Sequence, residues 1–402
     1  MSLADSTRER MARPSRGEGR TVLFVSNYRP DVGFAWWLME NFWVEFAQVA
    51  RRAGLRPVLV YPHPGPVPAS IHAAGIETVV LPFPGTSLAD WTRALRFVRA
   101  RNIHTVYFTD RRFASLFYLL LRAAGVKNVI NHDHTPGDRA PVGGLKGFLK
   151  VLWHRLRPVC CDLQICVSPL IQERAVRNGR VPIRRTTVVQ NGIVPVECGG
   201  DAEYAHRTLN LSPSSVVCVT VGRAHPYKRL DFVIEVARRC VKDRGLSNLV
   251  FVHCGDGPDM GRLRKLVAEA GLESHFIFGG RRDDVRKILC AVDLAIHAAQ
   301  GEAFSLSILE YMSACLPVLV PDIPSVSQAI TDRATGLVYP DGDADAAAAL
   351  IGTLLADRPW RVQVGEAAAL EVRERYTLDA MNRQFRSVIE DVLMGPVRRR
   401  LS

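Results

Sequence analysis

Residues 215–223 read SVVCVTVGR, an apolar run rich in β-branched side chains that closes on a glycine and an arginine. Runs of this kind, separated by longer amphipathic stretches, are typical of buried strands in a parallel sheet. Similar runs follow at residues 248–255, 275–280, 294–299, 316–321 and 336–340. The second half of the chain therefore predicts a doubly wound α/β domain rather than a sandwich or a bundle.

The same alternation fills the first half of the chain. Its apolar runs lie at residues 21–26, 56–61, 77–82, 104–109, 127–132 and 163–168. A chain of 402 residues is long for one core and suits two domains of similar size. Because ligands bind beyond the carboxyl ends of parallel strands, we expect two Rossmann-like, doubly wound sheets that face a central cleft.

Changes in composition predict the domain boundaries. Residues 1–20 are rich in Arg and Glu without an apolar stretch, which indicates a disordered leader. The first domain is predicted over residues 21–195, a linker with Pro and Gly over 196–214, and the second domain over 215–376. Residues 377–402 predict a helix that packs back on the first domain, followed by a basic tail.

Composition and charge limit the class of protein. Apolar residues make up 48% of the chain and charged residues 23%, which is typical of globular domains. The net charge of +12 suits nucleic acid, anionic lipid or phosphate-bearing small molecules, but no nucleic-acid reading motif accompanies it, so we expect no nucleic-acid partner. With no apolar run of roughly 20 residues and no secretory signal, we expect a cytoplasmic protein.

Neither the cysteines nor the acidic clusters predict a metal site. The nine cysteines are scattered without metal-binding spacing, so we expect reduced, partly buried thiols. The acidic run DGDAD at residues 341–345 imitates a metal-binding triplet, but it precedes a helical stretch and is interpreted as a helix cap.

Two carboxylates mark the most informative stretch, GEAFSLSILEYMSACLPVLVPD at residues 301–322. Glu302 ends a loop, and Glu310 follows eight residues later on a helix predicted to begin near Phe304 or Ser305. At a rise of about 1.5 Å per residue the two carboxylates lie roughly 12 Å apart. That distance is close to the span from a donor sugar across a diphosphate to a ribose.

The start of this helix suits a phosphate. The free amides of Phe304, Ser305 and Leu306 are expected to face the phosphates, assisted by the helix dipole. Arg223 and Lys228 follow the strand that opens the second domain. Such cations stabilise the negative charge that a leaving nucleoside diphosphate gains.

The carboxylate pair resembles the E-x7-E signature of retaining GT-B enzymes of glycosyltransferase family 4. The resemblance implies transfer of a sugar from a nucleotide-diphosphate donor, UDP- or GDP-linked, to a hydroxyl of a glycan or lipid-linked acceptor, without cofactor or metal. It assigns Glu302 a catalytic role at the donor sugar hydroxyls and Glu310 to the ribose. Arg223 and Lys228 would clamp the diphosphate, with Arg229 as an alternative to Lys228.

Three further residues are assigned to the donor by weaker matches. The stretch HCGDGPD resembles the family's Gly-rich turn and brings Gly255 close to the donor. The stretch FIFGGRRDDV resembles the segment that touches the nucleobase and includes Arg282. Asn191 belongs to VVQNGIVP, which resembles the Asn-Gly segment at the end of the first domain.

The first domain resembles the family less closely. In NVINHDHTPGD, the resemblance makes His134 the catalytic histidine near the reacting carbon, and His132 is the alternative. In the first loop, SNYRPDVGFAWWLMENFW, only Gly33 stands in for the family's Gly-rich, phosphate-contacting loop. Trp36 and Trp37 suit an acceptor pocket and a core equally well. A GT-B-fold nucleotide-sugar epimerase and a non-catalytic nucleotide-sugar-binding protein are the alternative functions.

One amphipathic stretch, residues 144–158, is not explained by the donor motifs. Its apolar residues are Leu145, Phe148, Leu149, Leu152 and Leu156, and its cations are Lys146, Lys150, Arg155 and Arg157. One interpretation is core packing with a solvated basic face. The other is a helix at an anionic membrane surface, which suits a lipid-linked acceptor and a peripheral position on the inner face of the membrane.

Overall fold

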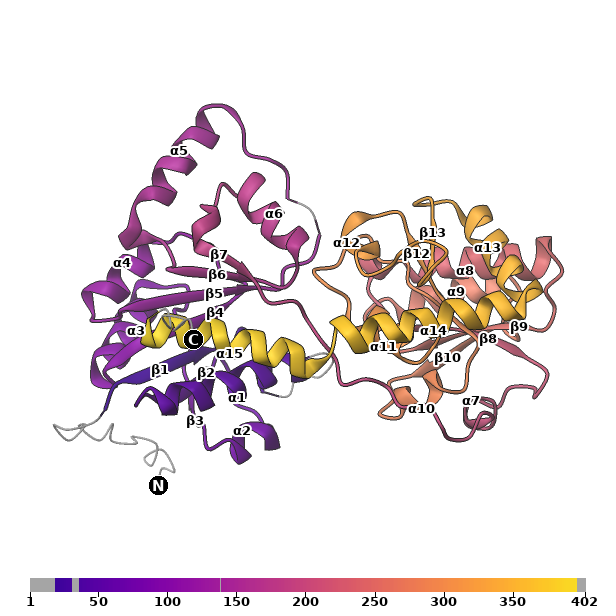
Figure 1. Cartoon of the computed structure of the whole chain (residues 1–402), viewed down its shortest axis with the longest axis horizontal. Helices are drawn as coiled ribbons and strands as arrows, with labels where there is room; N and C mark the ends of the chain where they lie inside the picture. The colour runs from indigo at the N-terminus through magenta and orange to yellow at the C-terminus, as the bar shows by residue number, and fades with distance from the viewer. Residues whose placement is uncertain (1–18, 31–35, 138, 396–402) are drawn as a thin grey trace, which may run out of the picture.

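Two α/β domains lie side by side in the computed structural model, which describes residues 19–30, 36–137 and 139–395 (Figure 1). The first contains a seven-stranded sheet of order β3-β2-β1-β4-β5-β6-β7, and the second a six-stranded sheet of order β10-β9-β8-β11-β12-β13. All neighbouring strands run parallel. The predicted GT-B architecture is therefore confirmed. The predicted leader lies outside the described residues, apart from Gly19 and Arg20.

The elements of the first domain match the predicted alternation, except at one edge. The strands are β1 Thr21–Val25, β2 Arg56–Tyr61, β3 Glu77–Val80, β4 Ile103–Thr109, β5 Asn128–Asp133, β6 Leu163–Cys166 and β7 Thr186–Val188. The helices are α1 Trp37–Arg52, α2 Ala69–Ala73, α3 Leu88–Ala100, α4 Leu116–Ala123, α5 Gly144–Arg155 and α6 Pro169–Arg177, with 3-10 turns η2 Arg157–Val159 and η3 Ile183–Arg185. Strand β7 was not predicted, because it is three residues long and only half-buried.

The second domain repeats the pattern. Its strands are β8 Val216–Val221, β9 Leu249–Cys254, β10 Phe276–Gly280, β11 Leu294–Ile296, β12 Val318–Pro321 and β13 Leu337–Tyr339. Its helices are α8 Leu230–Arg238, α9 Met260–Glu269, α10 Val285–Leu289, α11 Leu306–Ser313, α12 Pro324–Ser327, α13 Ala344–Ala356 and α14 Arg358–Arg375, with η4 Pro226–Lys228 and η5 Arg239–Asp243. The connection to the first domain carries α7 Tyr204–Thr208. The Asp343 carboxylate accepts a hydrogen bond from the Ala346 amide at 2.8 Å, so this part of DGDAD does cap α13.

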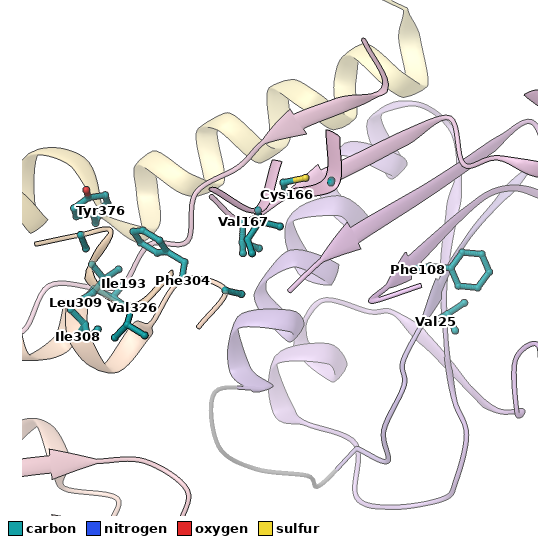
Figure 2. Packing of buried hydrophobic residues seen from close by; sticks show 14 of the residues in the cluster. Val25, Phe108, Cys166, Val167, Ile193, Phe304, Ile308, Leu309, Val326 and Tyr376 are labelled. Carbon is teal, nitrogen blue, oxygen red and sulfur yellow. The ribbon is translucent and has the colours of Figure 1, made fainter. Parts of the chain in front are cut away.

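The chain returns to the first domain through its last helix, α15 Leu378–Met394, which packs against α1 (Figure 1). At the crossing, the Ile193 amide donates to the Tyr376 carbonyl at 2.9 Å, and the Leu378 amide donates to the Ile193 carbonyl at 2.7 Å. Phe304 lies in the same buried cluster as Ile193 and Tyr376 (Figure 2). The loop before α11 is thereby packed directly on the junction between the domains.

A disulfide joins Cys198 of the interdomain connection to Cys290 at the end of α10. The expectation of reduced thiols is wrong for these two residues. They are 92 positions apart, so only the fold brings their Cα atoms to 5.3 Å. The remaining cysteines are free thiols, and all but Cys315 are buried. Across the described ranges, no helix combines the length and apolarity needed to cross a membrane.

Candidate active site

The loop before α11 presents a row of backbone donors. Helix α11 begins at Leu306, slightly later than predicted, and Ser305 caps it by accepting a hydrogen bond from the Ile308 amide at 3.5 Å. The amides of Phe304, Ser305, Leu306 and Ser307 have no hydrogen-bond partner among the described residues. Successive free amides at a helix start form a ready site for a phosphate group.

Two cavities meet at this helix start, beyond the carboxyl ends of both sheets. The first, about 510 Å³, is lined almost entirely by the second domain and is called the second-domain cavity. The other, about 410 Å³, has walls from both domains and is called the interdomain cavity. Both are lined by Arg223, Tyr227, Lys228, Leu306 and Ser307. One extended ligand can therefore reach from one cavity into the other past these residues.

Every described residue of the predicted site lines one of the two cavities. The second-domain cavity includes Gly255, Arg282 and Glu310, besides the shared Arg223, Lys228 and Leu306. The interdomain cavity includes His134, Asn191, Glu302, Phe304 and Ser305. Trp36 lines the interdomain cavity and Trp37 the second-domain cavity. Gly33 lies outside the described residues.

A third and larger cavity, about 630 Å³, lies between the interdomain connection and α10. Its walls include Val196, Tyr204, Arg286 and Cys290. None of the predicted site residues lines it, so size alone does not identify the site.

Glu302 is held by a cation and a histidine. Its Oε1 atom accepts hydrogen bonds from Lys228 Nζ at 2.5 Å and from His297 Nε2 at 2.8 Å. Burial opposes ionisation of Glu302, but the Lys228 charge and the His297 hydrogen bond outweigh it and lower its pKa to about 2. An ammonium has three donors, so Lys228 keeps two for a ligand. The sequence motifs missed His297, which directly follows β11.

The neighbouring cation Arg229 serves another purpose. Its guanidinium pairs with Asp341 at 2.6 Å, and it lines neither cavity of the candidate site. Lys228 is therefore the cation of this pair that faces the candidate site. Arg282 does line the second-domain cavity, but two nitrogens of its guanidinium already bond Asp284, at 2.7 and 2.6 Å. If Arg282 contacts a nucleobase, the contact must come from the rest of its side chain or from its backbone.

Gly255 is needed where the loops after β8 and β9 cross. A Cβ atom at this position would lie 1.8 Å from the carbonyl oxygen of Gly222. Because that neighbour is backbone, it cannot turn aside as a flexible side chain would. The glycine thus allows the loop that carries Arg223 to sit at the floor of the second-domain cavity.

The two histidines after β5 occupy different environments. His132 is fully buried, and its Nδ1 atom lies 2.6 Å from the Tyr107 hydroxyl. His134 lines the interdomain cavity, with no hydrogen-bond partner for its buried Nε2 atom among the described residues. Burial lowers the pKa of His134 to about 4, so its imidazole is neutral near pH 7. The geometry favours His134 over His132 as the residue that meets a ligand.

Asp110, which the sequence motifs missed, lies beside His134. It directly follows β4 with a left-handed backbone, φ 54°, and lines the interdomain cavity. Its Oδ1 atom accepts hydrogen bonds from the His134 amide at 2.6 Å and from the Thr135 hydroxyl at 3.4 Å. Burial, with a smaller contribution from the nearby Asp133 charge, raises the pKa of Asp110 to about 6.

A buried arginine fixes the loop that carries His134. Arg174 donates to the carbonyls of Thr135 and Gly137 and to the Asp133 carboxylate. The loop also touches the second domain, since a Cβ atom on Gly301 would lie 2.9 Å from Gly137 Cα. His134 of the first domain and Glu302 of the second thereby line the same interdomain cavity.

Asn191 joins the domains at the same place. Its Nδ2 atom donates to the Phe304 carbonyl at 3.3 Å, while its buried Oδ1 atom has no partner in the described part of the chain. Asn191 therefore holds the loop before α11, and its oxygen and its second amide hydrogen remain for a ligand.

Comparison with known proteins identifies the family. The model "Glycosyltransferase Family 4" matches residues 39–196, and "Glycosyl transferases group 1" matches residues 202–371. The chain belongs to glycosyltransferase family 4. The two matches meet at the interdomain connection and together span most of the chain.

Curated relatives and a solved structure agree with this assignment. N-acetyl-alpha-D-glucosaminyl L-malate synthase of Bacillus anthracis is 24% identical over 48% of this chain and 50% of its own length. UDP-Gal:alpha-D-GlcNAc-diphosphoundecaprenol alpha-1,3-galactosyltransferase of Escherichia coli is 27% identical over 46% of this chain and 49% of its own. The chain thus spans about half the length of these relatives. Anabaena HepE, solved in complex with UDP-glucose, shares the fold with a TM-score of 0.72 and 17% identity, covering 93% of this chain and 100% of that chain.

Proposed function

We propose that this family 4 chain is a retaining glycosyltransferase that moves a sugar from a nucleoside-diphosphate donor to an acceptor hydroxyl without a metal ion. One observation carries the proposal. Two carboxylates, Glu302 and Glu310, flank four free amides, and the cations Arg223 and Lys228 line the junction of the two cavities there.

The donor is assigned to the two cavities by charge. The nucleoside occupies the second-domain cavity, where the Glu310 carboxylate has no hydrogen-bond partner among the described residues and is available for ribose hydroxyls. The diphosphate lies at the junction, against Arg223, Lys228 and the amides of the α11 start. The sugar then enters the interdomain cavity between Glu302 and His134.

The proposed reaction breaks the bond between the anomeric carbon and the phosphate oxygen. The bond to the acceptor oxygen forms on the same face of the sugar, and the acceptor proton passes to the departing phosphate. Lys228 and the free amides stabilise the negative charge that grows on this phosphate. Glu302, fixed by Lys228 and His297, orients the sugar hydroxyls. The neutral His134 forms a hydrogen bond with the sugar near the anomeric carbon.

The relatives support a UDP-linked donor with a hexose-type sugar. The Anabaena neighbour was solved with UDP-glucose, and the names of the two curated relatives give N-acetylglucosaminyl and galactosyl groups. These are properties of those proteins, and the donor of this chain is our inference from them.

A panel of nucleotide sugars tests the proposal. A donor present at about 100 times its Kd is expected to add about 2.7 kcal/mol to the free energy of unfolding, measured by chemical denaturation. Mass spectrometry of incubations with candidate acceptors then identifies the product. If UDP, GDP and their sugar derivatives all leave the stability unchanged, the donor site proposed here is wrong.

The Asp110 carboxylate gives the reaction a predicted pH dependence. Its position in the interdomain cavity suits an acceptor hydroxyl, whose hydrogen bond the ionised carboxylate accepts more strongly than the protonated form does. Because the pKa of Asp110 is raised to about 6, kcat/KM is expected to fall as the pH drops below this value. Asp110→Asn should lower kcat/KM by about tenfold and remove this dependence. An unchanged acid limb in the variant would rule out Asp110 as its source.

A further inference from the structure

Helix α5 lies at the outer edge of the first domain (Figure 1). Its apolar side chains are exposed to solvent. The exposed fractions are 73% for Leu145, 60% for Phe148, 53% for Leu149, 41% for Leu152 and 52% for Leu156. These five residues are called the α5 stripe. Core packing, one of the two interpretations of this sequence, does not occur here.

The α5 stripe points away from the domain. At about 100° per residue, its members fall within roughly 100° of helix circumference. Gly147 and His154, the buried residues of α5, lie on the opposite side. Their contacts fix the helix, since His154 Nδ1 lies 2.9 Å from the Arg180 carbonyl, and a Cβ atom on Gly147 would lie 2.5 Å from the Val142 carbonyl oxygen.

Of the cations of this segment, which has no acidic residue, Lys146 and Arg155 lie on the two sides of the α5 stripe, whereas Lys150 lies on the side of Gly147 and His154. Lys146, Lys150, Arg155 and Arg157 form no ion pair with any described residue. The chain contains no Asp or Glu between residues 139 and 161. Burial lowers the pKa of Lys150, and the positive charges of Arg139 and Arg180 lower it further. The surface therefore combines exposed apolar area with uncompensated positive charge.

We propose that the α5 stripe docks on an anionic lipid bilayer, with its leucines and Phe148 among the acyl chains and the flanking cations at the lipid phosphates. A bilayer offers acyl chains to the apolar residues and, nearer its surface, phosphates to the cations. A second copy of this chain does not, because pairing two such faces would bring the flanking Lys146 and Arg155 toward like charges. Exposed Trp153, beside the stripe, suits the boundary between headgroups and acyl chains.

Docking at α5 places the proposed acceptor side of the site near the membrane. The loop that leaves His134 in the interdomain cavity runs directly into Gly144, the first residue of α5. Arg174 and Asn178 hold this loop through the carbonyls of Thr135 and Arg139. This consequence rests on the proposed function, and it identifies the acceptor class as lipid-linked. The docking itself does not depend on it.

Vesicle co-sedimentation of the full chain tests the docking. We expect binding to vesicles of phosphatidylcholine with one quarter phosphatidylglycerol, and at least tenfold weaker binding to phosphatidylcholine alone. Phe148→Glu/Leu152→Glu should reduce binding to the anionic vesicles by at least tenfold. Lys146→Ala/Arg155→Ala should also reduce it about tenfold, because each cation near such a surface contributes several-fold. High salt should weaken binding of the wild type more than binding of this variant.

A matched control separates the α5 stripe from exposed apolar residues in general. Val362→Glu/Leu370→Glu changes two exposed residues of α14 and should bind the anionic vesicles like the wild type. Stabilisation by UDP should be the same in all variants, so a failed donor site and a failed docking surface remain distinguishable. The proposal is overturned if the wild type does not bind anionic vesicles, or if the Phe148 and Leu152 variant binds them as well as the wild type does. It is also overturned if the wild type self-associates and that variant becomes monomeric in sedimentation analysis.

Discussion

Replacing Lys228 with methionine is expected to lower kcat/KM for glycosyl transfer by about a thousandfold. Methionine keeps most of the length and apolar stem of lysine but removes the charge at the junction of the two cavities. The departing diphosphate then loses a cation, and Glu302 keeps only the His297 hydrogen bond. Steady-state kinetics with the donor found in the panel measure the effect.

Arg229→Met provides the matched control for this substitution. Arg229 is the adjacent cation, but it pairs with Asp341 and lines neither cavity. The loss of this partly exposed pair is worth at most about 1 kcal/mol of stability, so kcat/KM should stay within about threefold of the wild type. Equal losses in the two variants would mean that the diphosphate does not lie at Lys228.

Substitutions of the two carboxylates are expected to change different kinetic constants. Glu302→Gln should lower kcat about a hundredfold, because Glu302 acts on the sugar where charge develops and also balances Lys228. Glu310→Gln should mainly raise the KM for the donor, by about tenfold, because a ribose contact is the same in the ground state and the transition state. The comparison requires both variants to unfold at similar denaturant concentrations. Matching kinetic profiles would contradict the separate positions assigned to sugar and ribose.

The fold was predictable because most of its central strands are buried on both faces. All residues of β1 and β9 are buried. Such strands appear in the sequence as continuous apolar runs, which differ from the polar composition of loops. Strand β7 lacks this signal, since its three residues are half-buried at the edge of the sheet.

The donor side of the candidate site was predictable where one stretch of chain carries several of the residues that would bind the donor. Glu302, Ser305 and Glu310 share a loop and a helix, so their spacing in sequence is their spacing in space. His297 and Asp110 directly follow other strands, and the order of strands in each sheet brings them to their partners. The only hint in the sequence was that each is a polar residue at the end of an apolar run.

Some features have no local signal at all. The pairing of Cys198 with Cys290 depends on how the interdomain connection passes α10. The periodicity of residues 144–158 predicted an amphipathic helix, but amphipathicity does not tell which face meets the protein. The direction was set by Gly147, which is small enough to approach the Val142 carbonyl and so turns the leucines outward.

A crystal structure with UDP bound tests the central claim most directly. We predict ribose hydroxyls within hydrogen-bond distance of Glu310, and the diphosphate against Lys228, Arg223 and the amides of Phe304–Ser307. The β-phosphate should point toward the interdomain cavity, where the transferred sugar would lie between Glu302 and His134. UDP bound in the larger cavity beside Cys290, or with its phosphates away from the start of α11, would contradict the account.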